Sequence, residues 1–396
     1  MIEPKHLPPS SALPAHLPTL DGLRGIAILL VMVHMFSLFE PHPGLVAYFY
    51  FKFNYVGWIG VQLFFVLSGF LITGILLDSR TSENYYRSFF ARRALRIFPL
   101  YFAVLIIAFV LVPMFGSVPT AIARDQPNQL WLWTYMGNWA EILGIGSKTF
   151  PHFWSLAVEE QFYLLWPFVI YRLSPEKCLR FCVALAVASF AVRCWLVWGG
   201  ASHETIYPNS FCRMDALGLG AAAAAAFRIP AWRERLIARR NILLRPAFIL
   251  TLIGIVVTRG FWHMTTIGQT MGYSLLSVIF VMLLATAVAH DQADASREAS
   301  AATRLSRWAG LLRWGPLRMI GKYSYGMYVF HKPLHDFAGA PLVQALGLPA
   351  RQSVVADMFY VLVMVIATLA VAAVSYHLFE IHFLGMKRYF TPRLNA

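Results

Sequence analysis

The chain has 396 residues, of which 58% are hydrophobic and only 13% are charged, and its formal net charge is +14. Soluble domains carry about 25% charged residues, so the composition excludes an ordinary soluble protein and indicates a polytopic membrane protein. The basic residues gather in short loops between apolar segments, which is the pattern that the positive-inside rule requires. We therefore expect contact with membrane lipids and no nucleic-acid partner.

The proline-rich segment 1–18 contains no apolar run, so we expect no cleavable signal peptide. We interpret it as a flexible cytoplasmic tail ahead of one transmembrane domain, 19–396. A membrane-spanning helix needs about 20 mostly apolar residues. The segments that meet this requirement are 22–39, 56–77, 98–115, 154–172, 180–198, 211–228, 242–258, 267–289, 319–338 and 354–380.

Segment 129–146 is rich in tryptophan but interrupted by Gly137, Asn138 and Glu141. The loop after the second span carries Arg80, Arg87, Arg92, Arg93 and Arg96 and is therefore placed in the cytoplasm. The later basic loops fall on the same side only if 129–146 does not cross. We thus predict an all-α protein with about ten transmembrane helices, both termini in the cytoplasm, and 129–146 as a re-entrant or interfacial segment on the outer side.

The first span, Thr19–Phe39, is almost entirely apolar but contains Asp21 and Arg24 at its start and His34 well inside. An ionisable side chain inside a bilayer is costly and is a functional candidate by default. His34 and Arg24 are therefore the first candidate residues.

The second span contains Ser68 beside Gly69. A serine in a membrane helix commonly bonds to a carbonyl one turn earlier, whereas Gly69 would allow a ligand or another helix to approach closely. The alanine run 221–226 likewise offers a small-residue surface for helix packing.

The arginines that follow the second span lie among aromatic residues. They can set the topology and contact lipid head groups, or they can recognise phosphate, because the planar guanidinium group pairs with phosphate oxygens in a bidentate manner. A nucleotide-like donor such as acyl-CoA would arrive from this side.

Further polar residues interrupt later spans. Glu159 and Glu160 lie about one turn inside the fourth span and point about 100° apart on a helix. They could hold an acceptor toward the outer side, or one could pair with a basic residue such as Arg213 or His152. For Arg213 and Asp215, in the sixth span, we favour an internal ion pair.

The ninth span places Ser324, Tyr328, His331 and His335 on one helical face. The two histidines have the spacing of metal ligands, but no HExxH motif and no third ligand accompany them. We therefore expect no metal and interpret this face as the lining of a polar cavity.

With these residues in place, the sequence resembles the acyltransferase-3 family of integral-membrane O-acyltransferases. The resemblance rests on LDGLRGIA, FFVLSGFLIT, RRALRIFPLY, FWSLAVEEQFYLLWP, RMDALGLG and GKYSYGMYVFHKPL, which follow the family order over nearly the whole chain. It implies transfer of an acyl group, commonly acetyl from acetyl-CoA, to a hydroxyl of a surface polysaccharide, a lipopolysaccharide, peptidoglycan or a smaller glycoside. It also implies the inner (cytoplasmic) membrane of a bacterium, no bound cofactor, and, because the chain ends soon after its last span, no appended SGNH-type domain.

The resemblance also implies roles for individual residues. His34 matches the essential histidine of the family, Arg24 its first-helix arginine, and Arg93 and Arg96 its RxxR pair. In the family ten residues usually separate the arginine from the histidine, whereas nine do so here, which turns His34 about 80° away from the face of Arg24 on a regular helix.

For the chemistry we expect His34 to remove the proton of the acceptor hydroxyl, or to carry the acyl group itself. Further catalytic candidates are Glu159 and Glu160, the donor-binding residues are Arg24, Arg93 and Arg96, and the acceptor-binding or cavity-lining residues are Ser68, Ser324, Tyr328 and His331. The rival hypotheses are a different acyl-CoA donor, such as succinyl-CoA, and a proton-coupled transporter or flippase of a glycan or lipid intermediate.

Overall fold

The computed structural model describes residues 16–40, 43–295, 307–349 and 351–393, and within these ranges it contains helices and no strand. Most of the expected N-terminal tail therefore lies outside the described residues. The longer helices are α1 (Pro18–Phe36), α2 (Leu45–Val56), α3 (Ile59–Asp78), α4 (Tyr85–Ile106), α9 (Phe153–Tyr171), α10 (Pro175–Trp198), α12 (Ser210–Ala226), α14 (Leu244–Val257), α15 (Tyr273–Ala295), α17 (Gly315–Leu334) and α19 (Val354–Ser375).

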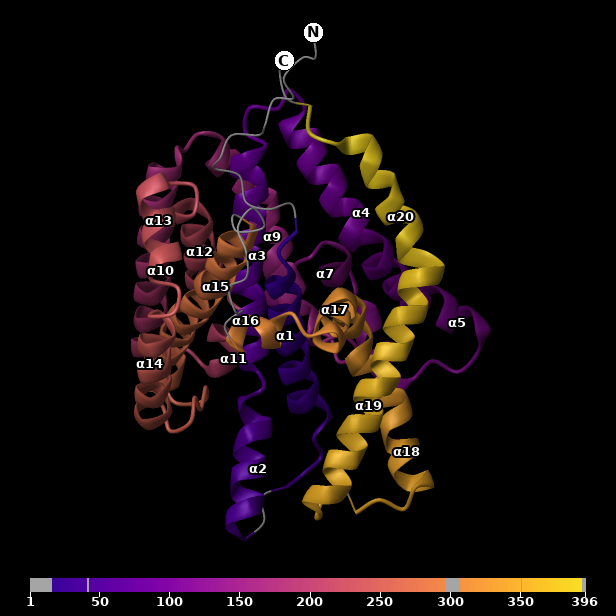
Figure 1. Ribbon diagram of the computed structural model, residues 1–396. Coiled ribbons are helices and arrows are strands. Elements are labelled where there is room, and N and C mark those ends of the chain that lie inside the picture. Colours follow the sequence, from indigo (N-terminus) through magenta and orange to yellow (C-terminus); the bar gives the residue numbers. More distant parts are fainter. Residues whose placement is uncertain (1–15, 41–42, 296–306, 350, 394–396) are drawn as a thin grey trace.

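Shorter helices connect or extend these (Figure 1). They are η1 (Ile107–Leu111), α5 (Val112–Phe115), α6 (Thr120–Asp125), η2 (Gln126–Asn128), α7 (Leu130–Trp133), α8 (Gly137–Ile142), α11 (His203–Ile206), α13 (Pro230–Ala238), η3 (Gly268–Gly272), α16 (Arg307–Leu312), η4 (His335–Gly339), α18 (Ala340–Ala345), η5 (Tyr376–Glu380), α20 (Ile381–Gly385) and η6 (Met386–Phe390).

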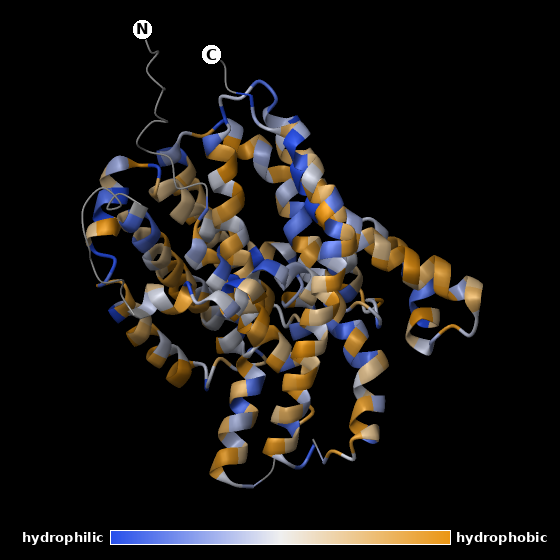
Figure 2. Ribbon diagram, turned by 45° about the vertical axis from the view of Figure 1, so that its right-hand side comes forward, coloured by the Kyte–Doolittle hydropathy of each residue, from blue (hydrophilic) through white to orange (hydrophobic). Residues whose placement is uncertain are grey.

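Each of the ten predicted spans coincides with a helix, but in the described part of the chain only six helical segments are long and apolar enough to cross a membrane. These are Pro18–Phe36, Leu45–Asp78, Tyr85–Phe115, Pro175–Trp198, Gly268–Asp294 and Val354–Phe390. The remaining predicted spans form α9, α12, α14 and α17, which are too short or too polar by the same criterion. The chain is a multi-pass membrane protein, with long hydrophobic stretches on its helices (Figure 2), and the predicted number of ten is not confirmed.

Segment 129–146 does not form one continuous helix. It is divided into α7 and α8, and between them Tyr135 adopts a left-handed backbone conformation with φ of 55°. Neither short helix is long enough to span a bilayer, because a spanning helix needs about 20 residues. Its predicted place as a re-entrant or interfacial segment on the outer side stays a prediction.

The basic loops after α3, α9 and α12 meet at one end of the molecule. Arg80 Nη1 donates to the carbonyl oxygen of Leu173 at 2.6 Å, and Arg228 Nε donates to Asp78 Oδ1 at the same distance. We call this the basic end; in Figure 1 it lies at the top, where α13 is also found. Most of the next basic loop, 296–306, lies outside the described residues.

Helix α1 occupies the centre of the bundle, between α3 and α17. A Cβ added at Gly60 would lie 2.3 Å from the carbonyl oxygen of Ala27, and one added at Gly57 would lie 2.2 Å from that of Leu30. The two helices therefore touch through their backbones and run antiparallel. Since α3 ends at the basic end, α1 directs Arg24 toward that end and His34 away from it.

Close packing also joins α3 to α12. A Cβ at Gly69 would lie 1.9 Å from the carbonyl oxygen of Leu217, and one at Gly220 would lie 2.1 Å from that of Val66. The alanines of 221–226 are all buried. Gly69 thus serves the approach of a helix, and the predicted small-residue packing surface is confirmed.

We expect Gly220→Ala to lower the free energy of unfolding by about 1–3 kcal/mol, the usual cost of overpacking a core. The new methyl group would collide with a backbone oxygen of α3. The measurement is the melting temperature of the purified protein in detergent. Gly385→Ala is the matched control, since nothing lies within 4 Å of its Cβ position. Equal melting temperatures for the two variants would contradict this account of the α3–α12 contact.

Candidate functional site

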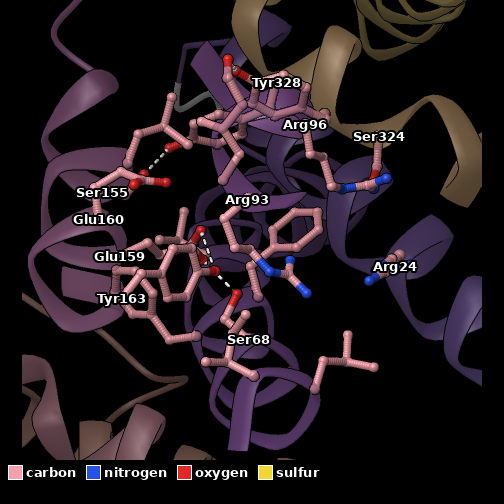
Figure 3. A pocket seen from close by; sticks show the side chains of 18 residues that line it. Arg24, Ser68, Arg93, Arg96, Ser155, Glu159, Glu160, Tyr163, Ser324 and Tyr328 are labelled. Atoms are coloured by element: carbon pink, nitrogen blue, oxygen red, sulfur yellow. Dashed lines mark hydrogen bonds between the residues drawn. The ribbon is translucent and has the colours of Figure 1, made fainter. Parts of the chain in front are cut away.

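Three arginines from two distant parts of the sequence line one cavity. Arg24 comes from α1, while Arg93 and Arg96 lie one turn apart on α4. Figure 3 shows their guanidinium groups on one side of the cavity and the carboxyl groups of Glu159 and Glu160, from α9, on the other. We call this space the arginine cavity. Its other polar lining residues are Ser68, Ser155, Tyr163, Ser324, Tyr325 and Tyr328.

The glycines of the LDGLRG motif explain how Arg24 reaches this cavity. A Cβ at Gly22 would lie 2.0 Å from the carbonyl oxygen of Leu312, and one at Gly25 would lie 2.3 Å from that of Leu317. These glycines let α1 pack directly on the backbone of α16 and α17. Arg24 lies on another face of the same turns and is left to line the cavity.

In the arginine cavity, the carboxylate of Glu159 has hydrogen-bond donors beside it, whereas the arginines have few acidic partners. Glu159 accepts hydrogen bonds from Ser68 at 2.8 Å and from Tyr163 at 3.2 Å. The only ion pair of Arg24 within the described residues is a 3.5 Å contact with Asp21, and neither Arg93 nor Arg96 has a carboxylate at ion-pair distance there. Among the described lining residues, three arginines therefore face two glutamates, and this excess of positive charge suits an anionic ligand.

His34 lies in a second cavity, away from the three arginines. Its titratable lining residues are His34, Glu141, His152, His203, Glu204, Tyr207, His263, Tyr328 and His331. We call this space the histidine cavity. Val61 and Tyr328 line both cavities, so the two are neighbours that share a wall. Helix α1 remains regular from Pro18 to Phe36, and the shifted register of Arg24 and His34 is accommodated because each faces its own cavity.

The environment of His34 defines its protonation pattern. His34 Nδ1 lies 3.1 Å from the carbonyl oxygen of Asn54. A carbonyl oxygen can only accept, so Nδ1 carries the proton and Nε2 of the neutral ring keeps its lone pair. Nε2 is thus the atom that can take up a proton, and a backbone carbonyl orients the ring.

Two other histidines of this cavity, both outside the predicted spans, form a neutral pair. His203 begins the short helix α11, and His263 lies in the loop between α14 and η3. His263 Nδ1 lies 2.7 Å from His203 Nε2. Burial, followed by the charge of Arg213, lowers the pKa of His203 to about 4, and burial with the neighbouring His203 lowers the pKa of His263 to about 3. These rings add no positive charge at neutral pH, so the histidine cavity differs in charge from the arginine cavity.

The residues of the predicted polar face of the ninth span do not all line one cavity. Ser324 lines the arginine cavity, Tyr328 lines both, and His331 lines the histidine cavity, whereas His335 bonds to Tyr360. The side chain of Tyr328 is held by Ser155 Oγ, 2.6 Å from its hydroxyl oxygen. Tyr328 therefore stands fixed at the shared wall.

His331 is fully buried, and its Nδ1 lies 2.6 Å from the carbonyl oxygen of Tyr328. Its Nε2 has no hydrogen-bond partner in the part of the chain that the structure describes. His331 is therefore a second neutral ring with a free lone pair in the cavity of His34. In the described part of the chain no group of three histidine, cysteine or acidic residues could hold a metal ion.

The expected ion pair between Arg213 and Asp215 is wrong. Asp215 pairs with Arg193, at 2.7 Å, and not with Arg213. Arg213 instead donates to Gln62 at 3.2 Å and lies over the rings of Tyr207 and Tyr273. The prediction relied on the closeness of Arg213 and Asp215 along one helix, whereas the partner of Asp215 comes from the neighbouring helix α10.

The interpretation that Ser68 bonds to a carbonyl one turn earlier in its own helix is also wrong. Its hydroxyl donates to Glu159 on α9 and not to a carbonyl of its own helix. Glu159 and Glu160 lie with the arginines rather than with His34. Their placement suggests that these carboxyl groups act within the arginine cavity.

The sequence analysis missed Asp357, a fully buried residue of α19. Its carboxylate accepts hydrogen bonds from Ser37 Oγ at 2.7 Å, Tyr50 OH at 2.7 Å and the backbone N–H of Leu38 at 2.8 Å. Asn54 Nδ2 in turn donates to Ser37 Oγ at 2.8 Å. Asp357 thereby fixes α2 against α1 and places the carbonyl that orients His34. Only its position in a predicted span could have signalled it.

We expect Asp357→Asn to loosen α2, because the amide cannot accept all three hydrogen bonds. Losing one bond to a charged acceptor, worth about 1.5–3 kcal/mol, should speed amide exchange in α2 by about tenfold to a hundredfold. Hydrogen–deuterium exchange of peptides covering 45–56 measures this. Exchange in α12, which does not touch Asp357, is the internal control, and unchanged exchange in α2 would contradict the role of the carboxylate.

The fold and the two cavities define a helical membrane protein with a cationic chamber beside a histidine-lined one. A family model described as an acyltransferase domain matches residues 17–377. The chain therefore belongs to the acyltransferase-3 family of membrane acyltransferases, as the motifs predicted.

The relatives of this chain include three bacterial proteins. It is 28% identical to the putative peptidoglycan O-acetyltransferase YrhL of Bacillus subtilis over 92% of this chain and 54% of that protein. It is 25% identical to O-acetyltransferase OatA of Staphylococcus aureus (93% and 57%) and 26% identical to peptidoglycan O-acetyltransferase OatA of Listeria monocytogenes (92% and 55%). The chain thus spans about half the length of these relatives. No solved structure matches it.

Proposed function

We propose that this protein is a membrane O-acyltransferase that moves an acyl group, acetyl in the first instance, from acyl-CoA to a hydroxyl group of an envelope glycan. The observation that carries the proposal is the pair of adjoining cavities. One is lined by three arginines, of which Arg93 and Arg96 have no carboxylate at ion-pair distance among the described residues, and the other contains His34. The names of two relatives make peptidoglycan the first acceptor to test.

In this proposal the donor enters from the basic end, which the positive-inside rule assigns to the cytoplasm of a bacterial inner membrane. Arg24, Arg93 and Arg96 bind its phosphates, because guanidinium groups match phosphate oxygens in geometry and charge. The thioester then reaches the shared wall at Val61 and Tyr328. The acceptor occupies the histidine cavity, whose neutral histidines suit an uncharged hydroxyl better than a phosphate.

His34 is the base of the proposed reaction. Its Nε2 takes the proton of the acceptor hydroxyl as that oxygen attacks the thioester carbonyl. The tetrahedral intermediate collapses, the carbon–sulfur bond breaks, and the departing thiolate receives the proton from His34. The hydrogen bond to Asn54 supports this role, since it leaves Nε2 free to accept.

The test is transfer by the purified full chain in nanodiscs, supplied with acetyl-CoA labelled in the acetyl group and with peptidoglycan fragments. Label in the glycan, recovered as an alkali-labile ester, is the expected result. No consumption of acetyl-CoA with any glycan offered would overturn the proposal.

Two cavities that share a wall also fit a transport path. If the protein were a proton-coupled transporter, proteoliposomes would move protons or a glycan substrate while acetyl-CoA remained intact. The same preparation therefore distinguishes the two functions.

A further inference from the structure

A third cavity adjoins the arginine cavity on the side of the basic end. It is lined by Ile75, Asp78, Ser79, Ser88, Phe89, Arg92, Arg93, Lys387 and Pro392. We call it the mouth cavity. Arg93 lines both this cavity and the arginine cavity, so the two cavities are neighbours and the mouth cavity lies between the arginine cavity and the basic end.

Residues 386–393 are fixed beside this cavity by hydrogen bonds to the start of α4. Ser88 Oγ donates to the carbonyl oxygen of Phe390 at 2.7 Å, and Asn84 Nδ2 donates to that of Thr391 at 3.0 Å. The backbone N–H of Arg393 returns a hydrogen bond to Asn84 Oδ1 at 2.9 Å. We call this docked segment, 386–393, the strap. It places Lys387 at the wall of the mouth cavity.

The net charge of the mouth cavity is positive. Its one acidic lining residue, Asp78, is engaged by Arg228 through both carboxylate oxygens. Among the described residues, neither Arg92 nor Lys387 has a hydrogen-bond or ion-pair partner. Three cationic groups therefore surround a space whose only carboxylate is already neutralised.

We propose that the mouth cavity binds the terminal phosphate monoester of the donor nucleotide, the 3′-phosphate of the CoA moiety, with Lys387 and Arg92 as its ligands. A compact ammonium group and a guanidinium group together match a doubly charged phosphate. Phe89 and Pro392 supply apolar surface for the adjoining nucleoside. The strap is then a specificity element for phosphorylated donors, and this assignment rests on the proposed function.

The first test compares acetyl-CoA with acetyl-dephospho-CoA, which lacks only the 3′-phosphate. The wild-type protein should show a KM about tenfold to a hundredfold higher for the dephospho donor, the range expected for losing a charge-assisted hydrogen bond. Lys387→Gln should raise the KM for acetyl-CoA by a similar factor and leave the KM for the dephospho donor unchanged. The matched control is Arg388→Gln, because Arg388 is the neighbouring exposed cation, bonds to Tyr389 and does not line the cavity.

The second test needs no turnover. Binding of adenosine 3′,5′-bisphosphate to the full chain in nanodiscs should be weakened by Lys387→Gln, whereas the weaker binding of adenosine 5′-monophosphate should not change. A Lys387→Gln variant that affects both donors and both nucleotides equally, or affects none, would overturn the proposal. An effect seen only with phosphatidic acid in the nanodiscs, and equal for both donors, would assign the site to a lipid phosphate instead.

The failure of this inference is distinguishable from the failure of the proposed function. If the protein turns over both donors without discriminating between them, the acyltransferase assignment stands and the phosphate subsite falls. If neither donor is consumed by any variant, the proposed function itself falls.

Discussion

Replacing His34 with glutamine is expected to reduce acyl transfer by about 10²–10⁴-fold, the usual contribution of a general base. Glutamine keeps the polarity and can still donate to the carbonyl of Asn54, but it cannot take up a proton at the position of Nε2. Because His34 does not line the arginine cavity, the affinity for the donor should remain. The measurement is kcat and KM for acetyl-CoA at a saturating concentration of acceptor.

The matched control is His335→Gln. His335 lies on the same segment as His331, but it bonds to Tyr360 and lines neither cavity. Its replacement should leave transfer within a few-fold of the wild type. Full transfer by His34→Gln would remove the proposed base, and a loss seen instead with His331→Gln would assign the base to the other free imidazole.

The same variants separate a base from an acyl carrier. If His34 carries the acyl group, acid-quenched wild-type protein given acetyl-CoA without acceptor should retain the mass of one acetyl group, and His34→Gln should not. If His34 acts only as a base, neither protein gains mass. Trapping by intact-protein mass spectrometry is therefore the companion measurement to the kinetics.

Replacing Arg93 with glutamine is expected to raise the KM for acetyl-CoA by about tenfold to a hundredfold, corresponding to about 1.5–3 kcal/mol for a hydrogen bond to a charged group. Arg93 lines both the arginine cavity and the mouth cavity, so it can contact the phosphates of the donor in either cavity. The kcat should fall less than the KM rises, because the acceptor and His34 occupy the other chamber.

Arg93→Lys tests the geometry of the same contact. Lysine keeps the charge but loses the planar fork, so a bidentate phosphate contact should be restored only in part. The control is Arg180→Gln, an exposed arginine on α10 that lines neither cavity. An unchanged KM in Arg93→Gln would contradict phosphate binding by the arginine cavity.

The sequence by itself determined the class of fold and the position of several candidates. Hydropathy and small-residue runs are local properties, so the helices and the close packing around Gly220 follow from the order of residues along the chain. The cost of an ionisable group in a bilayer likewise singles out Arg24 and His34 without a partner in view. The arginines after the second span could be recognised as suited to phosphate from the residue type alone, because a guanidinium group pairs with phosphate oxygens in a bidentate manner.

Only the tertiary structure decided which of these residues share a space. It assigned His34 and Arg24 to different cavities, placed Glu159 with the arginines, and paired Asp215 with a residue of another helix. It also revealed Asp357, whose hydrogen-bond partners lie far away in the sequence, and Lys387, which lines the mouth cavity with residues of α3 and α4. The physical reason is that hydrogen bonds and ion pairs between helices depend on which faces meet after assembly, whereas hydropathy and helical period report only on a residue's immediate neighbours in the chain.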